Sequence, residues 1–211
     1  MDSLSIKGVR VTESTTPRRG RGRRPAAVVR TEVLTAAGDL LLAEGLRAVT
    51  FERVAKEAGA SRTTLHKWWP SPGALAAEAY FARSAPALGF ADTGDLRADL
   101  VAQLTSFVRL VTAGGAGTAL VELVGAAQID PDLGDAWPQL YSLPRRELAR
   151  ARLRSAQRQG QLREDADLDI VVDQLWGACY HRLLVLRVPL EESLVPRLVD
   201  QALRGAACHP A

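Results

Sequence analysis

Apolar side chains recur every three to four residues along most of the chain, and this spacing predicts helices rather than strands. A long repeat runs from about Ala26 to Ala43, and Gly45 is placed to end that helix. A further helix is predicted to open at Ser71 and Pro72, which suit the N-cap and the first helical position. The remaining repeats predict helices over 95–112, 120–129, 136–159, 168–187 and 191–206. We therefore predict an all-α fold.

Two segments within this pattern need separate interpretation. Residues 86–94 predict a loop between the N-terminal helices and the rest of the chain. Pro144 lies near the start of the helix predicted over 136–159 and is a candidate kink. The basic run from Arg145 to Arg158 in that helix is predicted to be a solvent-exposed face with no part in DNA binding.

Residues 50–69, TFERVAKEAGASRTTLHKWW, predict two short helices joined by a glycine turn. Thr50 is a good N-cap for the first helix, and Ser61 is a good N-cap for the second. Gly59 between them can adopt the left-handed backbone that ends a helix. The first helix has an apolar face of Phe51, Val54, Ala55 and Ala58. Two helices joined in this way form the helix-turn-helix pattern, whose second helix enters the DNA major groove.

The outward face of the second helix carries hydrogen-bond donors and positive charge without any acidic residue. Leu65, Trp68 and Trp69 can point inward, which leaves outside Arg62, Thr63, Thr64, His66 and Lys67. We expect base-edge contacts from Arg62, Thr63 and Thr64. We expect contacts that fix the DNA backbone from Thr50, Ser61, His66, Lys67 and Trp68. Any helical hairpin can share part of this pattern, so the alternative is a hairpin with no DNA role.

The positive charge of the chain is concentrated at its N-terminus. The net charge is +3, but residues 1–30 hold eight Lys or Arg and only two Asp or Glu. We predict that residues 1–25 are disordered and form a basic arm, because they contain few large apolar side chains. Arg21, Arg23 and Arg24 alternate there with glycine and are candidates to enter a DNA minor groove. The alternative is a solubilising tail with non-specific affinity for phosphate.

These residues, with their neighbours, resemble a segment of a known protein family. The likeness rests on Glu44-Gly45, Val49-Thr50-Phe51, Val54-Ala55-Lys56-Glu57-Ala58-Gly59-Ala60-Ser61, Thr64-Leu65-His66, Trp69-Pro70-Ser71-Pro72 and Leu75. Through them the segment from Arg30 to Ala79 closely resembles the N-terminal domain of TetR/AcrR-family transcriptional repressors. The chain differs at His66, where the family usually has Tyr, and at Pro72, where the family commonly has Lys; both positions tend to face DNA phosphates.

The resemblance implies a homodimer that binds a palindromic operator in double-stranded DNA and joins through the last two helices of each subunit. The sequence agrees, because the helices predicted over 168–187 and 191–206 carry more apolar surface than one domain needs. A buried core helix in a monomer is the alternative. The resemblance also implies a pocket for a small-molecule effector inside the C-terminal helices, for which the sequence offers as walls Phe107, Trp137, Tyr141, Trp176, Tyr180 and His181.

Each of these candidate wall residues has a simpler interpretation. Aromatic residues at helical spacing often form only the core, and His181 has Glu122 or Asp173 as a candidate structural partner. We predict a basic arm over 1–25, a helix-turn-helix domain over 26–70, and a helical domain for effector binding and dimerisation over 71–211. A dimeric DNA-binding protein without a ligand response is the alternative function.

Composition argues against other classes of protein. The three histidines belong to no HExxH motif, and the sequence contains no nucleophile elbow or phosphate loop, so we expect no enzyme. Cys208-His209 lacks the spacing of a zinc site, and we expect neither metal nor cofactor. The sequence contains no run of eighteen apolar residues, so we predict no membrane span. The two cysteines fit a reduced, cytoplasmic protein.

Overall fold

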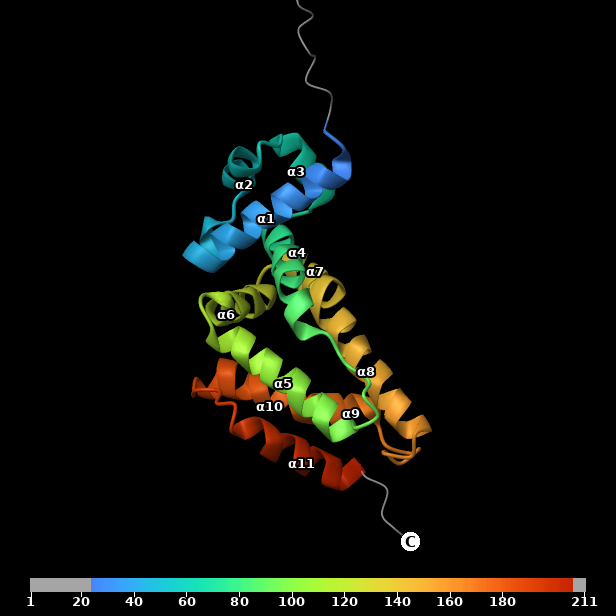
Figure 1. The fold of residues 1–211 in the computed structure, drawn as a ribbon. Helices are drawn as coiled ribbons and strands as arrows, with labels where there is room; N and C mark the ends of the chain where they lie inside the picture. The colour runs from blue at the N-terminus through green and yellow to red at the C-terminus, as the bar shows by residue number, and fades with distance from the viewer. Residues whose placement is uncertain (1–23, 207–211) are drawn as a thin grey trace, which may run out of the picture.

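The computed structural model describes residues 24–206, which fold into helices and contain no strand (Figure 1). The predicted all-α fold is confirmed. An N-terminal group of short helices lies at one end of the molecule in Figure 1, and α11 lies at the opposite end. The helix α4 runs from this N-terminal group toward the C-terminal helices, so it links the two parts of the chain.

The N-terminal group consists of α1 (Ala26–Glu44), η1 (Leu46–Ala48), α2 (Phe51–Ala58), α3 (Arg62–Trp68) and α4 (Pro72–Ser84). These bounds confirm the helices predicted from spacing and caps. The helix α1 packs against both α2 and α4. Val33, Val54 and Leu65 are completely buried where α1, α2 and α3 meet. Burying one such side chain is worth about 1.5–3 kcal/mol, which helps these three helices to hold together.

The C-terminal part contains η2 (Ala85–Leu88), α5 (Leu96–Thr112), α6 (Ala116–Ala127) and a helix that runs from Pro131 to Arg158 as α7 (Pro131–Trp137), η3 (Pro138–Ser142) and α8 (Leu143–Arg158). The next helix is divided into α9 (Leu168–Val172), η4 (Asp173–Gly177), α10 (Ala178–Tyr180) and η5 (His181–Leu186). The chain ends in α11 (Leu194–Ala206), which packs against α5 and η4.

Three predicted boundaries were wrong. The helix predicted over 120–129 begins at Ala116, and the one predicted over 191–206 begins at Leu194. The helix predicted over 136–159 begins at Pro131, because the Asp130 carboxylate accepts the Leu133 N–H and caps an earlier start.

The candidate kink at Pro144 takes the form of a π-helical turn. The turn η3 spans Pro138–Ser142 and directly precedes Pro144 in α8. Proline lacks an N–H and crowds the preceding turn, and a wider π turn accommodates it without ending the helix. The helix therefore continues from Pro131 to Arg158 and forms one long wall of the C-terminal part.

A buried ion pair joins α5 to α8. The Arg152 Nε donates to the Asp99 carboxylate at 2.7 Å, and both side chains are almost fully buried. The Thr93 hydroxyl and N–H donate to the same carboxylate at 2.7 and 3.1 Å. Burial alone would raise the pKa of Asp99, but the hydrogen bonds from Thr93 and Arg152 outweigh it and lower that pKa.

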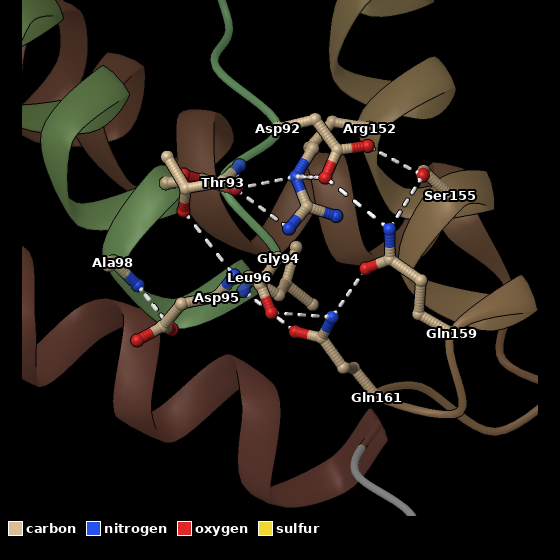
Figure 2. Close-up of polar contacts among 11 residues, drawn as sticks. Asp92, Thr93, Gly94, Asp95, Leu96, Ala98, Arg152, Ser155, Gln159 and Gln161 are labelled. Carbon is tan, nitrogen blue, oxygen red and sulfur yellow. Dashed lines mark hydrogen bonds and ion pairs between the residues drawn. The ribbon is translucent and has the colours of Figure 1, made fainter.

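Figure 2 shows the polar groups that surround this pair. Ser155 donates to Asp92 at 2.6 Å, beside the Arg152 side chain. Gln161 accepts the Leu96 N–H at 2.7 Å and donates to the Gly94 carbonyl at 3.1 Å. The start of α5 is thereby fixed to the end of α8 and to the loop that follows it.

Within residues 24–206, no single helix is both long and apolar enough to cross a membrane. Only α5 and α6 taken together meet that requirement, and they are bent by 89° relative to each other.

Candidate DNA interface and small-molecule cavity

The turn between α2 and α3 has the geometry that its sequence predicts. The Thr50 hydroxyl accepts the Arg53 N–H at 3.2 Å, and the Ser61 hydroxyl accepts the Thr64 N–H at 3.0 Å. Gly59 has φ 59° and ψ 33°, the left-handed conformation that costs glycine little. These three local features set the direction in which α3 leaves the turn.

Contacts with α1 and α4 hold the far end of α3. The Trp69 indole donates to Glu78 at 2.8 Å, and the same carboxylate accepts two hydrogen bonds from Arg30 at 2.6 and 2.7 Å. The Arg30 guanidinium lies 4.6 Å from the centre of the Trp69 ring and 5.9 Å from that of Trp68. Trp68 is partly buried by this packing, so its side chain also braces α3.

The structure brings most of the predicted DNA-contacting residues onto one surface. Arg62, Thr63, His66 and Lys67 are exposed on α3, and Thr50 and Ser61 are exposed at the two helix starts. Thr64 is partly buried, and its hydroxyl lies 2.8 Å from that of Ser61. The His66 ring packs edge-on against Phe51 with 4.5 Å between ring centres, which fixes its position.

Charges on this surface are distributed unequally between the two helices. Arg53 on α2 binds Glu44 at 2.5 and 2.7 Å, and Glu57 lies 3.5 Å from it. In contrast, no other described residue forms a hydrogen bond or ion pair with the side chains of Arg62 and Lys67. On α3 the positive charges of Arg62 and Lys67 are therefore unpaired among the described residues and can bind phosphate or base edges.

Of the predicted arm arginines, Arg24 belongs to the described residues, whereas Arg21 and Arg23 lie outside them. The Arg24 guanidinium donates to Glu32 at 2.5 Å and also to the Gly59 carbonyl. The predicted disorder of residues 1–25 likewise lies almost entirely outside the described residues. The contact with Gly59 places the start of α1 beside the helix-turn-helix, close to Ser61 and Thr64.

A cavity of about 340 Å³ lies between α5, η3, α8 and the helix from Leu168 to Leu186. This volume falls within the range of roughly 300–1,000 Å³ that is usual for small-molecule sites. Four predicted wall residues line it, namely Phe107, Tyr141, Trp176 and Tyr180. Further apolar walls come from Leu88, Phe90, Leu143, Ala149 and Val172.

The other two predicted wall residues do not line the cavity. Trp137 stacks on Tyr141 with 4.6 Å between ring centres, on the side away from the space. His181 is exposed on η5. The suggested partners of His181 are also engaged elsewhere, because Glu122 accepts the Leu46 N–H at 2.5 Å and Asp173 accepts from Arg146 at 2.6 Å.

Sequence reasoning missed the polar residues of this region, and on α8 these include Arg145 and Arg152. The run from Arg145 to Arg158 was predicted to be exposed, but Arg152 is 3% exposed and Arg145 lines the cavity. Both lie on the inward face of α8 with Ala149 and Ala156, at spacings of three and four residues. That periodicity was visible in the sequence and is the signal that could have identified them.

Apolar side chains remain exposed on the helix predicted for dimerisation. Ile170 is 55% exposed, Val185 is 66% exposed and Leu186 is 51% exposed. Gly177 lies between them along the helix and is exposed as well. The opposite side of the helix is buried, with Leu175 and Cys179 completely covered. In a single chain only one side of this helix is therefore packed.

The C-terminal part contacts the DNA-binding helices through α6 as well as through α4. The Glu122 carboxylate on α6 accepts the Leu46 N–H immediately after α1. Gly115 lies so close to α1 that an added Cβ would be 2.0 Å from the Leu42 carbonyl oxygen. The helix α4 also packs against α6, α7 and η3, and η3 carries Tyr141 of the cavity wall. A change in the cavity thus has direct contacts through which to reach α1 and α4.

Comparison with known proteins identifies both parts of the chain. Residues 33–79 match the family model for bacterial regulatory proteins of the tetR family, and residues 90–202 match that for a tetracyclin repressor-like C-terminal domain. The chain is 33% identical over 191 residues to the uncharacterized HTH-type transcriptional regulator YdeS of Bacillus subtilis, covering 90% of this chain and 96% of that protein.

Two further comparisons agree. The chain is 30% identical over 172 residues to the DNA-binding transcriptional repressor TetR of Mycobacteroides abscessus, covering 81% of this chain and 90% of that protein. The crystal structure of a TetR family transcription regulator is 54% identical, with a TM-score of 0.79, and covers 86% of this chain and 99% of that one. The chain belongs to the TetR family, and it is a DNA-binding transcriptional regulator.

Proposed function

We propose that this regulator is a cytoplasmic, homodimeric repressor that binds a palindromic operator and releases it when a small hydrophobic effector occupies the cavity. The observation that supports operator binding best is the outward face of α3. Its exposed Arg62 and Lys67 have no partner among the described residues, and the face carries no carboxylate. Such a surface suits both phosphates and base edges.

In this proposal the residues of the interface have two different roles. Arg62, Thr63 and Thr64 contact base edges, because they lie in the first turn of α3. The DNA backbone is held by Thr50, Ser61, His66, Lys67 and Trp68. Arg24 holds the turn through Gly59, while Arg21 and Arg23 enter the minor groove. The two copies of α3 lie in successive major grooves, roughly 34–36 Å apart.

The exposed apolar face of the helix from Leu168 to Leu186 supports the proposed dimer. Ile170, Val185 and Leu186 would each leave water on association with a second chain. The cavity lies against this same helix, so effector binding and the dimer geometry would be linked. The proposal assigns the chain no catalytic step.

The roles on α3 can be tested with the full-length protein. A selection from random duplexes should yield a palindromic site, and fluorescence anisotropy should then compare Arg62→Ala and Lys67→Ala with the unchanged protein. We expect Arg62→Ala to reduce discrimination at one or two base pairs by about 1–3 kcal/mol. Lys67→Ala should weaken binding to all sequences similarly. It should also reduce the slope of log affinity against log salt concentration by about 1, because one phosphate contact is lost.

Arg158→Ala is a matched control, because Arg158 is an exposed arginine at the end of α8, far from α3. It should leave both specificity and salt dependence unchanged. Equal losses of specificity from Arg62→Ala and Lys67→Ala would contradict the division of roles. A selection that yields no enriched site would contradict the proposed operator binding as a whole.

A further inference from the structure

The cavity is lined by a partly buried cation that no described residue neutralises. The Arg145 guanidinium donates to the Leu88 carbonyl at 2.9 Å and to the Ser84 hydroxyl at 3.4 Å. It lies 5.2 Å from the centre of the Phe81 ring. All of these partners are uncharged. The Arg145 Nε–H is buried and has no hydrogen-bond acceptor among the described residues.

The ionisable groups around Arg145 do not supply the missing negative charge. They are the phenols of Tyr80, Tyr141 and Tyr180. Burial raises the pKa of all three phenols, so they stay neutral at physiological pH and act as hydrogen-bond donors. Burial also lowers the pKa of Arg145, although a guanidinium still keeps its proton. This part of the cavity therefore holds one positive charge surrounded by neutral donors.

One carboxylate lines the cavity among the described residues, and it is already paired. Asp173 accepts from Arg146 at 2.6 Å, and Arg146 also binds Asp169 at 2.7 Å. The Asp173 side chain is 66% exposed, and it forms no ion pair with Arg145. Arg146 and Asp173 balance each other, and the charge on Arg145 remains uncompensated.

The cavity offers a second unused polar group. Gln103 is 5% exposed and lines the cavity, and its Oε1 has no hydrogen-bond donor among the described residues. A buried amide oxygen without a donor is costly, and a ligand hydroxyl or N–H would satisfy it. The remaining walls are mainly aromatic and aliphatic, so most of a ligand here would contact apolar surface.

We propose that the effector is an amphipathic anion, with a carboxylate or similar oxyanion that binds Arg145 and a flat apolar body that packs among the aromatic walls. This inference rests on the effector-responsive function proposed above and specifies its ligand. An aromatic cavity also suits an organic cation. The unpaired guanidinium decides between them, because it repels a cation and forms charge-assisted hydrogen bonds with a carboxylate.

The test uses matched pairs of compounds that differ only in charge. Benzoate, cinnamate and naphthoate are each compared with their uncharged primary amides, by calorimetry for binding and by anisotropy for release of the selected operator. We expect at least one carboxylate to bind roughly 10- to 100-fold more tightly than its amide, the range expected for a hydrogen bond between charged groups. The same carboxylate should release the operator.

Variants of Arg145 provide an independent check. Arg145→Gln should remove the preference for the carboxylate, and Arg145→Lys should retain part of it, because a lysine keeps the charge without the planar donor set. Arg154→Gln is the control, since Arg154 lies on the same helix outside the cavity and pairs with Glu147. It should leave the preference unchanged. The comparison of compounds on the unchanged protein remains decisive even where a variant fails to fold.

The outcomes separate this inference from the proposed function. Amides that bind as tightly as their carboxylates, and release the operator, overturn the anionic effector but retain the ligand-responsive repressor. A preference for the carboxylate that survives Arg145→Gln in a folded protein also overturns the assignment to Arg145. Binding of no carboxylate in the panel overturns the inference. Operator that stays bound whatever occupies the cavity overturns the ligand-responsive function itself.

Discussion

Two arginines on the inward face of α8 lie in opposite electrostatic environments. Arg152 has a buried partner, because its Nε lies 2.7 Å from the Asp99 carboxylate and Asp92 lies 3.5 Å away. The polar groups drawn around it in Figure 2 fix the neighbouring loops as well. Arg145 lies seven residues earlier, about two turns along the same face, and forms no ion pair with any described residue.

This difference separates a structural charge from a binding charge. A buried ion needs a counter-ion, and the cost of leaving it alone is several kcal/mol. Where the counter-ion is part of the chain, as Asp99 is for Arg152, the pair joins two helices. Where no described residue provides one, as for the partly buried Arg145 beside the cavity, we propose that a ligand does. We propose the same for exposed Lys67, for which DNA phosphate would be the partner.

The largest expected effect comes from removing the paired cation. Arg152→Met leaves the Asp99 carboxylate buried without its guanidinium, which should reduce the free energy of unfolding by about 3–5 kcal/mol. Urea denaturation followed by circular dichroism measures this change. Arg154→Met, which removes a more exposed arginine from the same helix, should have a far smaller effect. Equal losses from the two variants would mean that the Asp99–Arg152 pair does not stabilise the fold.

The loss of unfolding free energy caused by Arg152→Met should depend on pH. The folded-state pKa of Asp99 lies below its ordinary value of 3.8, so its contribution to stability is present above that value and is lost as pH falls through the folded pKa. Without Arg152, burial should raise the pKa of Asp99 instead, and protonation would relieve the unpaired charge. The gap in unfolding free energy between the unchanged protein and Arg152→Met should therefore narrow between pH 7 and pH 3, as urea titrations at each pH would show. A gap that stays constant would contradict the assigned role of the carboxylate.

The helix-turn-helix was predictable from sequence because its determinants are local. Thr50, Gly59 and Ser61 act within three or four residues of their own positions, and the structure shows the expected caps and left-handed turn. The apolar faces of α1 and α2 follow the helical period, so their burial was predictable too. Their placement in the fold confirms the resemblance on which the family assignment first rested.

The C-terminal part was less predictable because its determinants are distant in the chain. Asp99 and Arg152 are 53 positions apart, and neither residue alone indicates that the other is its partner. The π turn η3 begins at Pro138 and precedes Pro144, whereas η4 and η5 contain no proline, and helical spacing reveals none of the three. His181 follows Tyr180 directly, yet the structure turns it to the outside of the helix and away from the cavity.

The smallest expected effect on stability comes from replacing Arg145. It tests most directly whether Arg145 and Arg152 differ in role. Arg145→Met removes a partly buried charge together with its hydrogen bonds to the Leu88 carbonyl and the Ser84 hydroxyl. The lost hydrogen bonds cost stability, whereas relief from burying a charge offsets part of that cost. We therefore expect a change of only about 1 kcal/mol in the free energy of unfolding, measured by urea denaturation beside Arg152→Met. A loss as large as that of Arg152→Met would show that Arg145 is structural, because a charge kept for a ligand should be dispensable for folding when no ligand is bound.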